Sequence, residues 1–358
     1  MANFDSIELK AGKAAYEAIM DGGLKQEMIK LMAGAAGGPK WIVLGHLDRY
    51  LFGEWFKDRK EALPMIGSSI GAWRFASSMA FPDPIKGLEL FKEGYFAQAY
   101  TDKPTREEIT AVIPQVTKEY INPDTIPHIL NHPFARLFVI SVKSKGLLAS
   151  ENKLLQGTGL IATILGNLMN RKNLNAFFHR VLFHDPRGES SFLGKDAFPT
   201  TEVKLHKDNF EAALLATGAI PMVMEGIPNV PDAPKGMYRD GGLIDYHLTF
   251  PYQLGEGEIV FQPHFFEQVK PSWFDKKLKN RKPSATEKNH VLLLHPSQKL
   301  IDQLPGGYVP DRKDFENYPT KERQDRWEKA FEISKAVGDD FAELVQSGKI
   351  REKLKLWE

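Results

Sequence analysis

The sequence contains no cysteine. This absence excludes disulfide bonds, thiol nucleophiles, and zinc or iron–sulfur sites held by cysteine. An excess of charge of either sign is also missing, because 47 Lys and Arg residues stand against 46 Asp and Glu residues, for a formal net charge of +1. A chain without a net positive field is not expected to bind nucleic acid as its main partner.

Long hydrophobic runs are missing as well. The longest apolar stretches, residues 134–142 and 158–169, are much shorter than the roughly 20 residues that cross a bilayer. The first residues also lack the basic and then apolar pattern of a secretory signal. We therefore expect a cytoplasmic protein whose contact with membranes, if it has any, is peripheral.

The residues that are present have the balance of an ordinary globular protein, with 42% hydrophobic and 26% charged residues in a chain of 358. Strand and helix patterns alternate, with strands predicted over residues 28–32 and 63–66 and helices over residues 40–52 and 70–79. Further strands are predicted over residues 134–143, 178–183, 201–205, 258–262 and 290–295, and further helices over residues 88–100, 105–120 and 209–217.

This alternation predicts one α/β domain over residues 1–358, with a mostly parallel central sheet flanked by helices. A helical insert is expected at about residues 151–177, because that stretch interrupts the series of strands. The residues at about 311–358 are expected to form a helical C-terminal tail with an apolar side.

The residues from Gly67 to Gly71 match the pattern G-x-S-x-G, with Ser69 in the central position. They lie between a predicted strand and a predicted helix, which is the context of a nucleophile elbow, where a sharp turn exposes the serine hydroxyl. A Gly/Ser-rich turn in which Ser69 only caps the helix would give the same pattern. Ser69 is therefore a candidate nucleophile.

A glycine-rich loop, residues 33–40, precedes this motif and opens a helix. Consecutive glycines allow backbone N–H groups to point toward one developing oxyanion or phosphate. A helix beginning at Pro39 would place Gly38 at its N-terminal cap with a free N–H. The phosphate-loop pattern fits poorly because Trp41 follows Lys40 where a Ser or Thr is required, and the loop could also be a simple tight turn.

An Asp-Gly-Gly sequence, beginning at Asp240, occurs far along the chain. A serine nucleophile needs a base, and a carboxylate becomes a better base when burial raises its pKa. Asp-Gly-Gly alone is a common turn. Together with Ser69, Asp240 becomes a candidate general base.

In this chain order, the motifs resemble those of the patatin-like phospholipase family, including an Ala-x-x-Ala-x-Pro stretch at residues 216–221. The resemblance covers roughly residues 28–250. It implies a three-layer α/β fold and a serine acyl hydrolase that degrades lipid or phospholipid esters without a metal or organic cofactor. It also implies a catalytic dyad of Ser69 and Asp240 and an oxyanion hole at the backbone of Gly37 and Gly38.

The glycine loop departs from the family pattern. The usual Asp-Gly-Gly-Gly-x-Arg/Lys-Gly is here Ala35-Ala36-Gly37-Gly38-Pro39-Lys40-Trp41, which keeps two glycines and the basic residue but loses the acid, the first glycine and the last. Two alternatives remain open. One is an ordinary α/β-hydrolase with a Ser-Asp-His triad, completed by His247, His264, His290 or His295, and the other is a non-catalytic scaffold that binds acyl chains or a protein partner.

Two remaining features bear on partners and metals. The segment of residues 270–282 has many lysines interleaved with Trp273 and Phe274, a pattern typical of a solvated loop that is also a candidate for docking to a membrane surface or an acidic partner. His128 and His132 have the spacing of a helical ligand pair, but prolines bracket them and no Glu follows the first His. We therefore expect no metal site.

Overall fold

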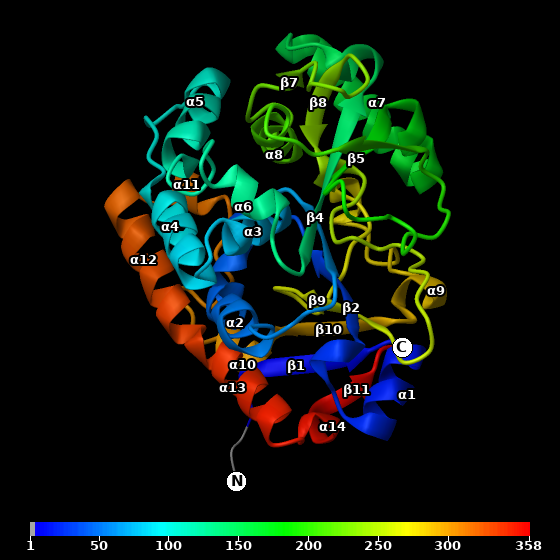
Figure 1. Cartoon of the computed structure of the whole chain (residues 1–358). Coiled ribbons are helices and arrows are strands. Elements are labelled where there is room, and N and C mark those ends of the chain that lie inside the picture. Colours follow the sequence, from blue (N-terminus) through cyan, green and yellow to red (C-terminus); the bar gives the residue numbers. More distant parts are fainter. Residues whose placement is uncertain (1–3) are drawn as a thin grey trace.

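The computed structural model describes residues 4–358. Within these residues, eleven strands form one sheet (Figure 1). The strands are β1 (Ile7–Ala11), β2 (Ile29–Gly34), β3 (Leu63–Ser68), β4 (Ala135–Ser144), β5 (Phe178–His184), β6 (Thr200–Lys204), β7 (Ile227–Pro228), β8 (Met237–Asp240), β9 (Ile259–Pro263), β10 (Val291–Pro296) and β11 (Leu354–Leu356).

The main order of the sheet is β11-β1-β10-β9-β2-β3-β4-β5-β6, and β8 pairs with both β4 and β7. The central strands from β10 to β4 are parallel. Antiparallel pairs occur where β1 meets β10 and where β4 meets β5 and β8. The central strands are almost entirely buried, as expected of a parallel sheet covered on both faces. The sequence prediction of an α/β fold with a mostly parallel sheet is confirmed.

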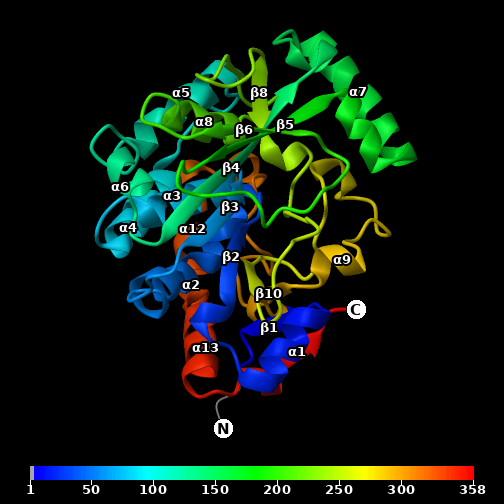
Figure 2. The same ribbon diagram turned by 45° about the vertical axis from the view of Figure 1, so that its right-hand side comes forward.

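Helices flank this sheet. They are α1 (Lys13–Gly22), α2 (Gly45–Tyr50), α3 (Ile70–Met79), α4 (Pro84–Ala97), α5 (Arg106–Thr117), α6 (Ile126–Leu130), α7 (Lys153–Met169), α8 (Phe210–Gly218), α9 (Ala285–Lys288), α10 (Gln298–Ile301), α11 (Asp314–Asn317), α12 (Thr320–Ile333), α13 (Lys335–Gln346) and α14 (Ile350–Lys353). Figure 2 shows α2, α3, α4, α12 and α13 over one face, whereas α7 lies at the edge of the other side of the molecule.

The hydrophobic core has a large part on the helical face and a smaller part on the opposite face. The large cluster joins residues of α3, such as Phe75, to the sheet and to Trp327 and Phe341 of the C-terminal helices. The smaller cluster lies under the chain that follows Asp245, where Leu248 and Phe250 cover the sheet. Both faces of the strands that carry the candidate site are thus fixed by packing.

Three expectations from the sequence need correction. β1 was not predicted, and the end of the C-terminal tail, expected to be helical, forms β11, which pairs with β1. The helix predicted over residues 40–52 is a succession of a 3₁₀ helix η2 (Gly38–Leu44), α2 and a π-helical turn η3 (Leu51–Trp55). It begins at Gly38 and not at Pro39. Short strands carry little pattern of their own, and their pairing is decided by distant residues.

Candidate active site

Ser69 lies at the turn between β3 and α3. β3 ends at Ser68, α3 begins at Ile70, and Ser69 between them has φ 53° and ψ −130°. A non-glycine residue with positive φ costs on the order of 1–3 kcal/mol and persists only where the surrounding structure holds it. Ser69 therefore has the strained backbone that the sequence predicts for a nucleophile elbow.

The last glycine of the motif is needed because two backbones meet there. A Cβ on Gly71 would lie 1.9 Å from the carbonyl oxygen of Gly34, at the end of β2. No side chain fits at that distance, so the G-x-S-x-G pattern allows α3 to begin against the end of the neighbouring strand. The pattern is thus explained by the packing of β2, β3 and α3.

Asp240 is hydrogen-bonded to Ser69 although 171 residues separate them. The Ser69 hydroxyl donates to Asp240 Oδ2 at 2.8 Å, and the N–H of Gly242 donates to Asp240 Oδ1 at 2.7 Å. Both side chains are largely buried, with 8% of each residue exposed. A carboxylate in this position can accept the hydroxyl proton when Ser69 attacks a carbonyl carbon.

The sheet register accounts for this meeting. In the parallel pair of β3 and β4, Ser68 lies opposite Ile140. In the antiparallel pair of β4 and β8, the next residue, Ser141, lies opposite Asp240. β4 therefore serves as a common template that brings the end of β8 beside the end of β3.

The stretch at residues 216–221 contacts the backbone of both site residues. Thr217 Oγ1 accepts a hydrogen bond from the Ser69 N–H at 2.8 Å and donates to the carbonyl of Ile140. The carbonyl of Ala219 accepts the Asp240 N–H at 3.0 Å. The sequence alone assigns Thr217 no role, because a threonine inside a helix gives no signal of such a contact.

Burial raises the pKa of Asp240 to about 6. The hydrogen bonds from Gly242 and Ser69 and the positive charges of Arg312 and Lys276 lower this pKa, but their effect is smaller than that of burial. The ionised form is disfavoured because the carboxylate has lost most of its water. An aspartate with this pKa is a stronger base than an exposed one and is still ionised at pH 7.

Gly37 and Gly38 lie beside the Ser69 hydroxyl and the Asp240 carboxylate. Gly37 precedes η2, and Gly38 is its first residue, with φ +58°. The first N–H groups of a helix have no acceptor within the helix, so these amides are available to a ligand. Both glycines line a small cavity of about 120 Å³ that also contains Ser69 and Asp240.

Ser69 also lines a larger cavity of about 650 Å³. Its walls are mostly apolar and aromatic and include Trp73, Phe91, Ile113 and Met224. Ser69, Gly38 and Arg312 line both cavities, so the serine hydroxyl stands where they join. The sequence alone does not reveal this cavity, because its lining comes from helices that are distant along the chain.

Cationic side chains surround the small cavity. Lys276 and Arg312 line it, and Lys40 forms an ion pair with Asp311 at its edge. Burial lowers the pKa of Lys276 to about 8, and the neighbouring charges of Lys40 and Arg312 act in the same direction. Arg312 was missed by sequence reasoning, since it lies in an irregular segment without a motif.

The histidines are placed elsewhere. In residues 4–358, no histidine is hydrogen-bonded to Ser69 or Asp240. The hydrogen bonds of His264, His290 and His295 join their rings to backbone groups, and His247 Nδ1 accepts the N–H of Lys270. Burial lowers the pKa of His247 well below its usual value and that of His264 to about 3, which makes both rings weak bases.

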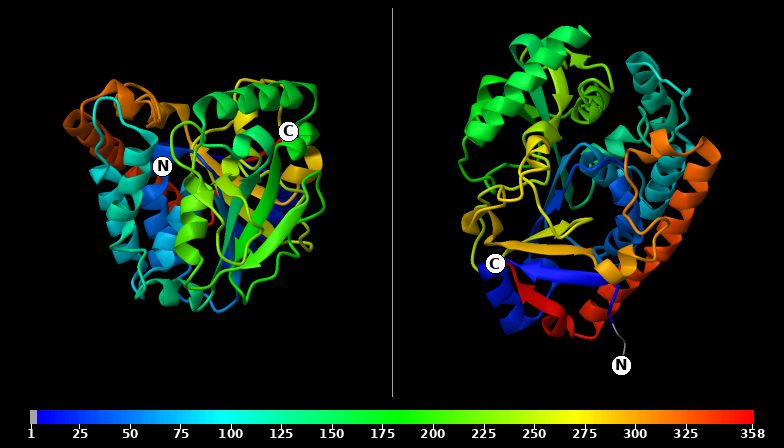
Figure 3. Two further views of the ribbon diagram at one scale, coloured as in Figure 1. Left: turned by 90° about the horizontal axis from the view of Figure 1, so that it is seen from above. Right: turned by 180° about the vertical axis from the view of Figure 1, so that it is seen from behind.

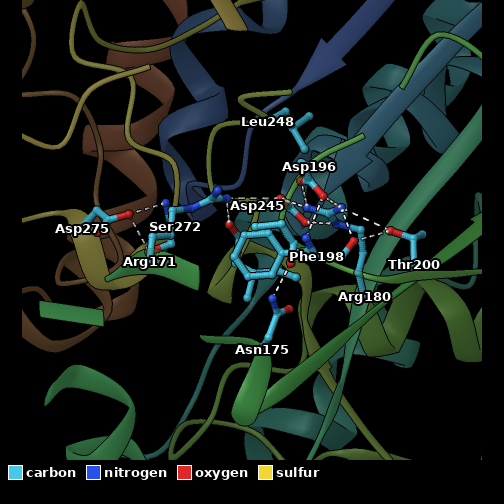
Figure 4. A network of polar contacts seen from close by, with 12 residues as sticks. Arg171, Asn175, Arg180, Asp196, Phe198, Thr200, Asp245, Leu248, Ser272 and Asp275 are labelled. Carbon is cyan, nitrogen blue, oxygen red and sulfur yellow. Dashed lines mark hydrogen bonds and ion pairs between the residues drawn. The ribbon is translucent and has the colours of Figure 1, made fainter. Parts of the chain in front are cut away.

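A buried polar network holds the chain that follows Asp240 (Figure 4). Arg180 of β5 donates to both oxygens of Asp245, at 2.7 and 2.8 Å, and also binds Asp196. Arg171 donates to the carbonyl of Ile244 at 2.8 Å. Because breaking a buried ion pair leaves an uncompensated charge, this network fixes the 3₁₀ turn η6 (Gly241–Leu243) that supports Asp240.

Two further results limit the kinds of site. The described residues contain no cluster of three or more His, Asp or Glu side chains arranged to hold a metal ion. None of the helices in residues 4–358 is long and apolar enough to cross a membrane.

Comparison with known proteins gives little guidance. No family model matches the chain, and no curated protein matches it. Among solved structures, it is similar to human GIVD cytosolic phospholipase A2, with a TM-score of 0.39 and 11% identity, over 95% of this chain and 65% of that one. This likeness is too distant to assign an activity, which has to be inferred from the residues of the chain itself.

Proposed function

We propose that the protein is a serine acyl hydrolase of the patatin-like type, which cleaves carboxylic esters of lipids with Ser69 as nucleophile and Asp240 as base. The observation that carries the proposal is the 2.8 Å hydrogen bond from the Ser69 hydroxyl to the buried Asp240 carboxylate, at a strained turn between strand and helix. Backbone strain and shifted pKa values cluster at functional sites, and here Ser69 and Asp240 combine the two within one hydrogen bond.

The reaction follows from the placement of these groups. Ser69 Oγ attacks the acyl carbonyl carbon while its proton passes to Asp240, and the N–H groups of Gly37 and Gly38 stabilise the oxyanion. The tetrahedral intermediate collapses, the leaving alcohol takes the proton from Asp240, and an acyl-enzyme remains. Water then attacks the acyl carbon and gives a proton to Asp240. When the bond between Ser69 Oγ and the acyl carbon breaks, Asp240 returns that proton to Ser69 Oγ, which releases the carboxylic acid and restores the serine hydroxyl and the ionised aspartate.

The two cavities suggest how a lipid ester would lie. The large apolar cavity suits an acyl chain, because such a chain gains free energy when it leaves water. Lys276 and Arg312 at the small cavity favour a leaving group with a negative charge, such as the phosphate of a phospholipid. The proposed substrate is therefore an ester that combines an apolar acyl chain with an anionic alcohol.

Labelling with a fluorophosphonate tests the nucleophile. We expect one covalent adduct, located on Ser69 by mass spectrometry, because Ser69 borders both cavities whereas the hydroxyl of Ser68 is fully buried and has no hydrogen-bond partner. The Ser69→Ala variant should not be labelled. An adduct on Ser68, or an equally strong adduct in Ser69→Ala, would show that the nucleophile has been wrongly assigned.

The pH dependence tests the base. Since Asp240 must be ionised to accept the Ser69 proton, and its pKa is about 6, kcat/KM should fall about tenfold per pH unit below pH 6 and level off above pH 7. The measurement is ester hydrolysis between pH 4.5 and about 8, with circular dichroism at each pH to show that the protein stays folded. A flat profile across this range contradicts the assignment of Asp240.

A further inference from the structure

Helix α7 exposes apolar residues and buries polar ones. Seven of its large hydrophobic side chains have between 42% and 83% of their surface exposed: Leu154, Leu155, Ile161, Ile164, Leu165, Leu168 and Met169. Its buried positions are instead Gln156, Gly159, Thr163 and Asn167. These two sets recur at helical spacing on opposite faces, so the pattern of an ordinary surface helix is reversed.

The polar residues that face inward are paired. Gln156 accepts the N–H of Met222 at 2.9 Å and donates to the carbonyl of Ser150 at 3.1 Å, and Asn167 donates to Asp275 Oδ1 at 2.8 Å. Turning the helix to hide its apolar side would remove these hydrogen bonds from the Met222 N–H and from the buried carboxylate of Asp275. The outward orientation of the apolar face is therefore fixed by the fold.

The exposed side chains form one patch. Eleven large hydrophobic residues are exposed in the described part of the chain, and nine of them lie on α7, at Leu147 just before it, or at Met222, whose N–H binds Gln156. Single exposed hydrophobic residues are ordinary, but a concentration of this kind marks an interaction surface. Figure 2 and the left view of Figure 3 show α7 at the periphery, with no other helix outside it.

Cationic residues flank the patch. α7 packs against η4 (Gly146–Ala149), η5 (Arg171–Ala176) and η7 (Trp273–Asp275), and Arg281 donates to the carbonyl of Asn167 at 3.0 Å. Residues 145–175 and 273–282 together contain nine Lys or Arg residues and two acids. Both acids are already engaged within the protein, Glu151 with Arg106 and Arg239, and Asp275 with Asn167 and Ser272.

We propose that α7 and the basic segment of residues 276–282 dock the protein on an anionic lipid bilayer. The apolar face of α7 would enter the boundary between head groups and acyl chains, and the flanking lysines would contact anionic head groups. The charge complementarity selects this occupant, because a second copy of the chain would bring the same cations face to face.

The patch also leads to the candidate active site. Leu160 of α7, together with Ile220 and Pro221 beside Met222, lines the small cavity that contains Ser69 and Asp240. A bilayer held on α7 would lie next to that opening. Docking does not depend on the chemistry at Ser69, so the two proposals can fail separately.

Binding of the whole protein to vesicles tests the docking surface. We expect binding to vesicles of phosphatidylcholine mixed with phosphatidylserine to be at least about tenfold tighter than to phosphatidylcholine alone, and to weaken as salt is added. Replacing Leu154, Ile161 and Leu165 together by Gln should weaken binding about a hundredfold, because these residues point outward and Gln keeps the helix. The pair Met20→Gln and Leu356→Gln, also exposed but remote, is the matched control and should bind normally.

A second pair of variants tests the charges. Replacing Lys277, Lys279 and Lys282 by Gln should lower affinity for the anionic vesicles by about tenfold or more, whereas replacing the exposed Lys321, Lys329 and Lys335 should have little effect. The Ser69→Ala protein should bind as the parent does. The proposal is wrong if the parent does not bind either kind of vesicle, or if the α7 variant binds as well as the parent. It is also wrong if sedimentation shows that α7 is covered in a dimer that the α7 variant breaks.

Discussion

Asp240→Asn should lower the rate of ester hydrolysis by about four orders of magnitude, comparable to the loss when the carboxylate of a serine hydrolase triad becomes an amide. An amide can keep the hydrogen bond from the Gly242 N–H, which Asp240 Oδ1 accepts at 2.7 Å. It cannot take up the proton of Ser69. The turn should therefore keep its shape while the base is lost. The measurement is kcat/KM on a soluble ester.

The stability of this variant separates a chemical loss from a structural one. The pKa of Asp240 in the folded protein is about 6, above its usual value of 3.8. The folded state therefore disfavours the charged form, and this penalty is present above pH 6 and disappears as the pH falls toward 4. A neutral Asn removes the penalty, so Asp240→Asn should unfold at the same or a higher temperature at pH 8.

A double substitution and a set of histidine variants sharpen the test. If Ser69 and Asp240 act as one unit, Ser69→Ala combined with Asp240→Asn should be no slower than Ser69→Ala alone. No single replacement of His247, His264, His290 or His295 should remove activity as fully while the protein stays folded. If one of them did, the base would be that histidine, and a Ser-Asp-His triad would replace the dyad.

Gly38→Val should lower kcat by about two orders of magnitude with a smaller change in KM, which is the loss expected when one oxyanion donor is removed. A Cβ at Gly38 would meet only the hydroxyl of Tyr95, at 3.7 Å, so the substitution is not excluded by crowding. The difficulty is the backbone, because a β-branched residue strongly resists φ +58°. Relief of this strain would rotate the Gly38 N–H away from Ser69.

Gly348→Val is the matched control for this variant. Gly348 has φ +71° and nothing within 4 Å of an added Cβ, so the strain is similar but lies in the turn between α13 and α14. Both variants should lose stability to a similar extent, and only Gly38→Val should lose turnover. Normal turnover in a folded Gly38→Val protein would mean that the glycine loop is only a turn and that other groups hold the oxyanion.

The strongest sequence predictions depend on residues that are close in the chain. The strand before Ser69 and the helix after it were predicted within two residues of their observed ends. Gly71 can be recognised in the sequence because it belongs to the G-x-S-x-G motif. The reason that a glycine is needed there, the nearby carbonyl of Gly34 on β2, is seen only in the structure. Hydrophobic periodicity and turn-forming residues are signals carried by a few neighbouring residues, so they can be read directly from the sequence.

The orientation of α7 shows where local pattern fails. Apolar residues at helical spacing predict a helix, and residues 153–169 form one. The usual rule would bury that apolar face, whereas Gln156 and Asn167 take the buried side because they form hydrogen bonds with Met222 and Asp275, which belong to distant segments. Periodicity defines two faces of a helix, but only the surrounding contacts decide which face meets the protein.

The sequence by itself determined the α/β class, the elbow at Ser69 and the glycine loop at Gly37 and Gly38, because each is specified by neighbouring residues. Only the tertiary structure decided that Asp240 meets Ser69, through the shared pairing with β4. It alone also placed Thr217 under the elbow and raised the pKa of Asp240 by burial. Strand register and the loss of water around a carboxylate are properties of the assembled core, and no short stretch of sequence contains them.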